Sequence, residues 1–200
     1  MKPAVVYLHG FSSSPKAWKA SLLTNAMASR ELSARFFCPA LSFSPTEALA
    51  SAERALRECV DSGASPTLVG SSLGAFYATI LAERHAIRAV LVNPVVTAKK
   101  PLESFIGVQN NLQTGEAFEL TREHVAALEA METSAITPER YLVLVETGDE
   151  VLDYREAVFR YAGARQYVFE GGDHSFTRFP EMLPVVFDFC GFSFQDARSV

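Results

Sequence analysis

The chain has 200 residues, 48% hydrophobic and 20% charged, which is the composition of a globular domain that buries a core without disulfide or metal staples. A formal net charge of -5 and an isoelectric point near 5.4 give no basic surface, which argues against nucleic acid and anionic membranes as partners. The sequence has no C-x-x-C pair and no signal peptide, so we expect a cytoplasmic protein with reduced thiols. No apolar run approaches the roughly 18 residues of a membrane span, so we expect a soluble protein with no stable membrane insertion.

Six short runs of β-branched and aromatic residues are expected to form strands. Several runs are apolar throughout, which is typical of strands covered on both faces. Every run except the fourth is followed by one clear helix, so the element order predicts an α/β fold with helices on both faces of a mostly parallel sheet. The runs are residues 4–8, 34–38, 67–70, 88–93, 141–146 and 165–170.

The helices between these runs have recognisable ends. The Ser-Pro pair at residues 14–15 predicts the start of the first helix. Residues 44–47 supply a capping serine, a first-turn proline and a reciprocal glutamate, which predict a second helix over residues 45–62, ended by Gly63. Further helices are expected after residue 74 and over residues 121–132, 152–161 and 180–189.

The segment between the fourth and fifth strands, residues 94–138, is longer than an ordinary crossover connection. Loops of this length in compact domains are usually functional or disordered. No internal repeat or low-complexity tract divides the chain. We interpret residues 1–200 as a single domain that carries residues 94–138 as a short, helical, cap-like insertion.

Residues 70–74, Gly-Ser-Ser-Leu-Gly, match the pattern G-x-S-x-G with Ser72 at its centre. The pattern lies between a predicted strand and a predicted helix, which is the context in which it forms a nucleophile elbow. Glycines on both sides leave room for the sharp turn that lifts the Ser72 hydroxyl above the sheet edge. The alternatives are a plain glycine-rich turn or a phosphate-binding loop, but neither G-x-G-x-x-G nor G-x-x-x-x-G-K-[ST] occurs there.

A serine nucleophile needs a base, which histidine commonly provides. His174 follows the last predicted strand beside two glycines that free its backbone, and we prefer it for this role. His85 lies at the end of the helix after the elbow, where it favours the helix dipole, and His124 lies in the first turn of a surface helix. His9 is expected to pack and hydrogen-bond beneath its loop.

A carboxylate should orient the imidazole, and Asp149 stands just beyond the carboxyl end of the fifth strand. The chain order serine, aspartate, histidine is that of α/β-hydrolases. Glu150 and Asp153 on the same loop, and Asp173 next to the histidine, remain alternatives.

An oxyanion formed at Ser72 needs amide donors. The Leu73 N–H at the start of the helix is one candidate. The loop after the first strand supplies the other, the Phe11 N–H, beside Gly10, which lets the backbone approach closely. Phe76, Phe105 and Phe176 are candidates for an acyl pocket, with a place in the core as the alternative for each.

Together, "YLHGF", "GSSLGA", "TGDEVLDY" and "GGDHSF" resemble the α/β-hydrolase superfamily, and residues 3–191 resemble the small bacterial YqiA-like esterases. This resemblance implies a serine esterase acting on small to medium acyl esters, and on thioesters as a further class. It implies Ser72, Asp149 and His174 as the catalytic triad, Phe11 and Leu73 as oxyanion donors, and no metal or organic cofactor. The alternative is a hydrolase-fold protein that binds a ligand without catalysis. The sequence leaves the oligomeric state open.

Overall fold

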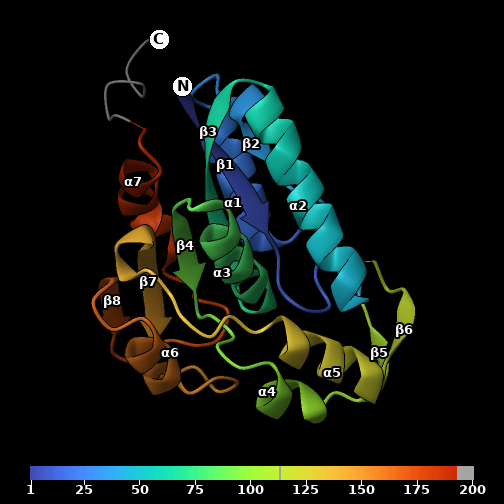
Figure 1. Ribbon diagram of the computed structural model, residues 1–200. Helices are drawn as coiled ribbons and strands as arrows, with labels where there is room; N and C mark the ends of the chain where they lie inside the picture. The colour runs from blue at the N-terminus through green and yellow to red at the C-terminus, as the bar shows by residue number, and fades with distance from the viewer. Residues whose placement is uncertain (113, 193–200) are drawn as a thin grey trace.

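The computed structural model describes residues 1–112 and 114–192, and the end of the predicted domain, 193–200, lies outside them. Six strands of the described chain form one parallel sheet in the order β2-β1-β3-β4-β7-β8 (Figure 1). Every predicted run contributes one of them, so the predicted α/β class is confirmed. Their bounds are β1 (Lys2–Leu8), β2 (Phe36–Phe37), β3 (Ala64–Ser71), β4 (Ala89–Val92), β7 (Tyr141–Glu146) and β8 (Arg165–Phe169).

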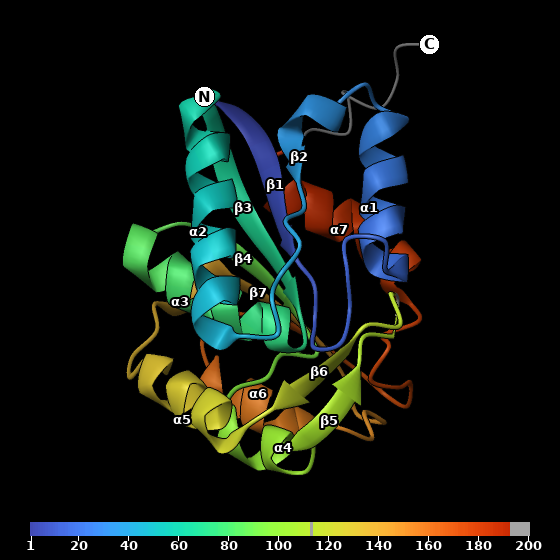
Figure 2. The same ribbon diagram turned by 90° about the vertical axis from the view of Figure 1, so that its right-hand side faces the viewer.

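Helices cover both faces of the sheet, as Figure 2 shows with α2 and α3 on one side and α1 and α7 on the other. Alternate residues of β1 point to opposite faces of the sheet. Val6 packs in the hydrophobic core on the α2 and α3 side, and Val5 packs in the core on the α1 and α7 side. Burial on both faces explains the unbroken apolar runs. The covering helices are α1 (Trp18–Ala28), α2 (Pro45–Asp61), α3 (Leu73–His85), α6 (Tyr154–Arg160) and α7 (Phe179–Phe189).

Two predicted helix starts differ in detail from the structure. The first helix begins at Trp18 rather than at residues 14–15, where Ser14 Oγ accepts a hydrogen bond from the Lys16 N–H in a turn. Pro45 does begin α2, but the Ser44 side chain makes no capping bond. Glu47 instead accepts a hydrogen bond from the hydroxyl of Ser42, two residues before the predicted capping serine.

The segment between β4 and β7 is not purely helical, which corrects the sequence prediction. Beside its helices it forms a two-stranded antiparallel sheet, which extends across the carboxyl end of the main sheet in Figure 2. Exposed positions on both strands hid this hairpin from a search for apolar runs. Its elements are α4 (Lys99–Glu103), β5 (Gly107–Asn110), β6 (Ala117–Leu120), α5 (Arg122–Met131) and a 3-10 turn, η2 (Pro138–Arg140).

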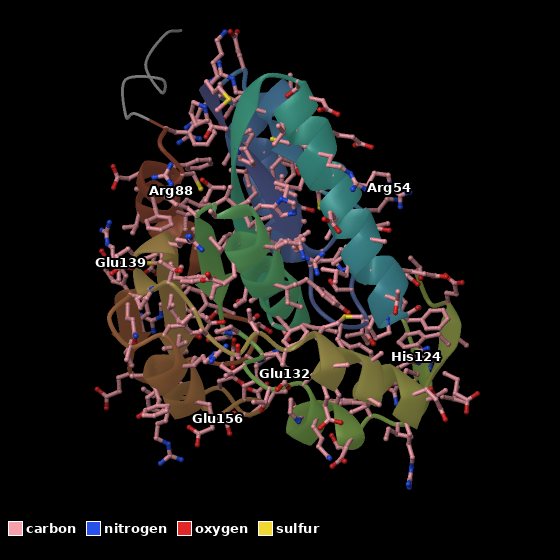
Figure 3. All side chains as sticks on the ribbon, in the orientation of Figure 1. Arg54, Arg88, His124, Glu132, Glu139 and Glu156 are labelled. Carbon is pink, nitrogen blue, oxygen red and sulfur yellow. The ribbon has the colours of Figure 1, made fainter. Side chains whose placement is uncertain are left out.

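The insertion is tied to the main domain at several points. The Leu112 N–H donates to the Ser12 carbonyl in the loop after β1, at 2.9 Å. Glu132, labelled in Figure 3, accepts a hydrogen bond from the Ala98 N–H at 3.0 Å and so joins the two ends of the insertion. On α3, Glu83 accepts hydrogen bonds from residues near the start of β7. The bond from Leu112 holds the hairpin turn against the loop that follows β1.

No helix in the described part of the chain combines the length and the apolar character that crossing a bilayer requires.

Candidate active site

Ser72 occupies the turn between β3 and α3 with a φ of 55° and a ψ of -123°. An L-residue adopts such a positive φ only at a local cost, so the surrounding structure must hold the turn in place. A Cβ on Gly74 would overlap the Leu8 carbonyl oxygen of β1, so only glycine allows this close approach of helix and strand. The G-x-S-x-G pattern therefore forms the strained strand-to-helix elbow that the sequence predicts.

Three side chains from separate loops form one hydrogen-bonded chain at this elbow. His174 Nε2 lies 3.0 Å from Ser72 Oγ. On the other side of the ring, His174 Nδ1 lies 3.0 Å and 2.9 Å from the two carboxylate oxygens of Asp149. An ionised carboxylate only accepts, so Nδ1 carries the proton and Nε2 is free to accept the hydroxyl hydrogen.

The Asp149 carboxylate is held by its own loop. Its Oδ1 accepts hydrogen bonds from the Val151 and Leu152 N–H groups at 2.9 and 2.8 Å. Its side chain is only 2% exposed, so it cannot turn out into water. These two backbone donors hold the carboxylate in place, facing the histidine ring.

The three alternative carboxylates have other partners or positions. Glu150 accepts a hydrogen bond from the His174 N–H rather than from the ring. Asp153 caps α6 and forms an ion pair with Arg155. Asp173 makes no hydrogen bond to the neighbouring imidazole, and its Oδ1 is buried without a partner. Among these candidates, the geometry therefore favours Asp149.

The loop that carries His174 is held from beneath by Asn93, which the sequence analysis did not select. Asn93 follows β4, is 2% exposed and has a φ of 40°. Its Nδ2 donates to the carbonyls of Asp173 and His174 at 3.0 and 3.2 Å, and its Oδ1 accepts from the Glu146 N–H at 3.1 Å. One buried amide thus joins the ends of two strands to the histidine loop.

Glu146, the last residue of β7, is the second support that the sequence analysis missed. It is 1% exposed. Its carboxylate accepts from the Asp173 N–H at 2.8 Å and from Arg178 Nε at 2.5 Å. A Cβ on Gly172 would collide with this carboxyl group, which explains the glycine two residues before the histidine. The sequence did contain an indication of this role: Glu146 ends a strand that is otherwise apolar. A carboxylate buried at such a position needs hydrogen-bond or ion-pair partners.

The loop after β1 approaches the nucleophile from the opposite side. A Cβ on Gly10 would lie 3.2 Å from Ser72 Cβ and 3.7 Å from Ser72 Oγ. Phe11 follows at once, and Leu73 is the first residue of α3, so both proposed amide donors come from segments next to Ser72. His9 is buried: its Nε2 accepts from the Leu41 N–H at 3.0 Å, and its Nδ1 donates to the Gly10 carbonyl. Burial lowers the pKa of His9, which favours the neutral structural ring that the sequence predicts.

Two cavities meet at Ser72, His174 and Phe11. One of about 260 Å³, here called the insertion pocket, lies against α4 and the loop after Asp149. The other, of about 530 Å³, is called the Lys19 pocket and lies against the start of α1 and the loop after His174. The apolar residues of the insertion pocket include Val95, Pro101, Leu102, Phe105, Val151 and Leu152.

Of the three predicted acyl-pocket residues, the structure places Phe105 beside Ser72 and the other two in the core. Phe105 lines the insertion pocket and is 36% exposed. Phe76 is 4% exposed and packs in the cluster beneath α3. Phe176 is fully buried between the sheet and the α1 and α7 layer, where its ring meets Phe169 edge to face. Its φ of 54° turns it inward just two residues after His174.

The remaining histidines and the cysteines lie apart from this site. His85 pairs with Glu53 on α2 rather than acting on the helix end alone. His124, labelled in Figure 3, caps the first turn of α5 within the insertion. Burial raises the pKa of the Cys38 thiol to about 12, so no reactive thiolate forms there. Within residues 1–112 and 114–192, no group of three or more His, Cys, Asp or Glu side chains is arranged to hold a metal ion.

Residues 4–191 match the Uncharacterised protein family (UPF0227). The chain belongs to this family. Solved structures show the wider relationship. The chain is 18% identical to a protein of Agrobacterium vitis S4, with a TM-score of 0.73 over 94% of this chain and 88% of that one. The fold is that of the α/β-hydrolases, as the resemblance in sequence implied.

Two further structures have the same fold. The chain is 16% identical to the mouse alpha/beta hydrolase domain-containing protein 10, with a TM-score of 0.67 over 96% of this chain and 90% of that one. It is 13% identical to Est1E from Butyrivibrio proteoclasticus, solved with ferulic acid bound, with a TM-score of 0.63 over 92% and 86% of the two chains. At these identities the likeness concerns the fold alone.

Proposed function

We propose that this UPF0227 member is a serine esterase that hydrolyses small to medium acyl esters through an acyl-enzyme intermediate. The observation that carries the proposal is the unbroken relay from Ser72 Oγ to His174 Nε2 and from His174 Nδ1 to Asp149, with distances of 2.9 to 3.0 Å. The strained elbow beneath Ser72 adds weight, because a strained backbone persists only where its surroundings enforce it.

In the first half-reaction, Ser72 Oγ attacks the acyl carbonyl carbon while His174 Nε2 takes the hydroxyl proton. The Asp149 carboxylate stabilises the resulting imidazolium. The Phe11 and Leu73 N–H groups donate to the oxyanion, and each such donor contributes about 3 to 4 kcal/mol to transition-state stabilisation in related chemistry.

The tetrahedral intermediate then collapses as the bond to the leaving oxygen breaks, and His174 gives its proton to that oxygen. Water attacks the acyl-enzyme next and gives one proton to the same imidazole. Collapse of the second intermediate returns the proton to Ser72 Oγ and releases the acid. The insertion pocket, with its apolar wall around Phe105, is the proposed site of the acyl chain.

Thioester hydrolysis is a second activity of the same site, because the relay accepts either leaving atom and selectivity resides in the pockets. Because Est1E was solved with ferulic acid bound, esters of aromatic acids are also worth testing as substrates. The competing hypothesis is a protein that keeps the relay but only binds its ligand.

A fluorophosphonate probe tests the proposal directly, since it labels only an activated serine. We expect labelling of the wild type, none of Ser72→Ala, and retained labelling of Ser71→Ala, the neighbouring serine of the same turn. Likewise, the wild type and Ser71→Ala should hydrolyse p-nitrophenyl butyrate, and Ser72→Ala should not. A folded wild type that resists the probe and leaves the ester intact would support the binding-protein hypothesis instead.

A further inference from the structure

Lys19, in the first turn of α1, is a lysine next to the relay that the proposed mechanism does not use. Its Nζ donates to the Ser175 carbonyl at 2.7 Å, one residue beyond His174. Burial lowers the pKa of Lys19, although the nearby carboxylates of Asp173 and Glu146 act in the opposite direction. An ammonium carries three donors, and the bond to Ser175 uses one of them.

The nearby carboxylates do not consume the remaining donors. Both oxygens of Glu146 are engaged, one by the Asp173 N–H and the other by Arg178. Asp173 Oδ1 is buried and unbonded. Within the described part of the chain, Lys19 forms no ion pair, so its charge is attracted by carboxylates that it does not contact.

The Lys19 pocket reaches from this ammonium to the nucleophile. It encloses about 530 Å³, within the range of small-molecule sites. Lys19 is the one lysine or arginine among the described wall residues, and no carboxylate lines the cavity. Most of the other polar side chains in the wall of this pocket carry hydroxyl groups. The wall beyond Ser72 and His174 includes Tyr7, Ser13, Trp18, Lys19, Ser175 and Thr177.

The two cavities differ in chemistry and lie against different elements. The insertion pocket has about half the volume of the Lys19 pocket. Its wall is largely apolar and includes the proposed oxyanion donor Leu73. The Lys19 pocket follows the chain onward from His174 to Ser175 and Thr177. Because His174 Nε2 protonates the leaving oxygen, the leaving group departs on the side of the histidine loop.

From this division we propose that the substrates are esters of an apolar acid with an alcohol that carries an anionic group such as a carboxylate, which Lys19 binds. The inference rests on the proposed esterase function and adds the substrate class to it. The acyl chain occupies the insertion pocket, whose volume of about 260 Å³ equals that of roughly nine water molecules at ~30 Å³ each. The larger Lys19 pocket holds the charged alcohol, whose anion accepts charge-assisted hydrogen bonds from Nζ.

A matched pair of esters tests this assignment. The esters 3-(butyryloxy)benzoate and 3-(butyryloxy)benzamide share the acyl chain and the ring and differ in charge on the alcohol side. We expect wild-type kcat/KM to be about tenfold higher for the anionic ester, less than a fully buried ion pair would give, because Lys19 is only partly buried. Lys19→Met should make the kcat/KM values of the two esters equal, and Lys19→Arg should keep part of the preference. Lys16→Met, which removes an exposed lysine of the preceding turn, is the control for net charge and should change neither rate.

A second pair of substrates tests which side of the ester carries the charge. Phenyl hydrogen glutarate and its neutral amide place the difference in the acyl part. If Lys19→Met changes only this pair, or if the wild type hydrolyses the two alcohol-side esters equally, the assignment is wrong while the esterase function stands.

Binding of the alcohol product separates failure of this inference from failure of the proposed function. Calorimetric titration of Ser72→Ala with 3-hydroxybenzoate should give an affinity about tenfold above that for 3-hydroxybenzamide, and the double variant with Lys19→Met should lose the difference. Such binding without any turnover by the wild type would refute the esterase and support the anion pocket. Equal binding of the two compounds would refute the pocket whatever the turnover.

Discussion

Replacing Asn93 by aspartate tests whether the histidine loop is held as the structure shows. The change keeps the shape of the side chain, and aspartate, like asparagine, tolerates the φ of 40° at this position. It removes the Nδ2 donor and leaves an oxygen facing the Asp173 and His174 carbonyls, which now lie 3.0 and 3.2 Å from the amide nitrogen. The bond from the Glu146 N–H to Oδ1 can remain.

The expected cost follows from the two lost bonds and the new repulsion. Each neutral hydrogen bond contributes about 1 kcal/mol net, and leaving buried acceptors unpaired adds roughly 1 to 3 kcal/mol. We therefore expect Asn93→Asp to lower the free energy of unfolding by about 3 to 5 kcal/mol. With a urea m-value of about 2 kcal/mol/M, the unfolding midpoint falls by about 1.5 to 2.5 M.

The effect on activity is separate and larger. If the loop shifts by about 1 Å, His174 leaves hydrogen-bonding distance of Ser72, and a displacement of that size costs on the order of 100-fold in rate. Fluorophosphonate labelling and ester hydrolysis, measured at a temperature where the variant is folded, should slow in proportion to each other. Asn25→Asp, a change of the same chemistry at an exposed position of α1, is the control and should leave both rates unchanged.

Two outcomes would refute this reasoning. Unchanged stability would mean that the Asn93 amide contributes nothing net to folding. Lower stability with normal labelling of the folded protein would mean that Asn93 supports the sheet edge but does not position His174.

Three further predictions address other parts of the structure. Gly10→Ala should fold but lose at least about tenfold in kcat/KM, because its Cβ would lie 3.2 Å from Ser72 Cβ; a normal rate would show that the loop after β1 can yield. Phe105→Ala should reduce the rates for hexanoate and octanoate esters more than for acetate, since it removes apolar wall from the insertion pocket; an equal loss for all chain lengths would place the acyl chain elsewhere. Glu83 has a lowered pKa because hydrogen bonds from Tyr141 and Thr137 and the charge of Arg140 outweigh desolvation by burial. Its stabilisation is therefore full above the ordinary carboxyl pKa and is lost as the pH falls through the lowered value, so the stability difference between wild type and Glu83→Gln should be largest near pH 7 and shrink below about pH 4. A difference independent of pH in urea unfolding would contradict that assignment.

The elements that the sequence identified are those set by local pattern. Burial on both faces makes a strand such as β7 apolar at nearly every position, and that pattern is visible without any partner. The elbow at Ser72 is also local in part, because a Cβ on Gly70 would clash with the backbone of Gly74 and Ala75 in the same turn. His174 and Asp149 followed from the rule that the carboxyl ends of parallel strands meet at one edge.

Local pattern also has a limit, which the insertion illustrates. The hairpin of β5 and β6 alternates between partly buried and exposed positions on short strands, so it has no apolar run to mark it. Phe76 lies on α3, where every residue from Leu73 to Ala82 is buried. A helix covered on all sides has no polar face from which the direction of one ring can be inferred.

The sequence alone determined the α/β class and the elbow, since strand burial and turn sterics act within a few neighbouring residues. It also selected Ser72 and His174 but left Asp149 as one of four candidate carboxylates. Only the tertiary structure decided what Asn93, Glu146 and Lys19 do. Their partners lie far away in the chain, Asn93 being 81 residues from His174 and Lys19 being 156 from Ser175. A hydrogen bond across such a separation exists only after the sheet has brought both ends together, so no local pattern records it.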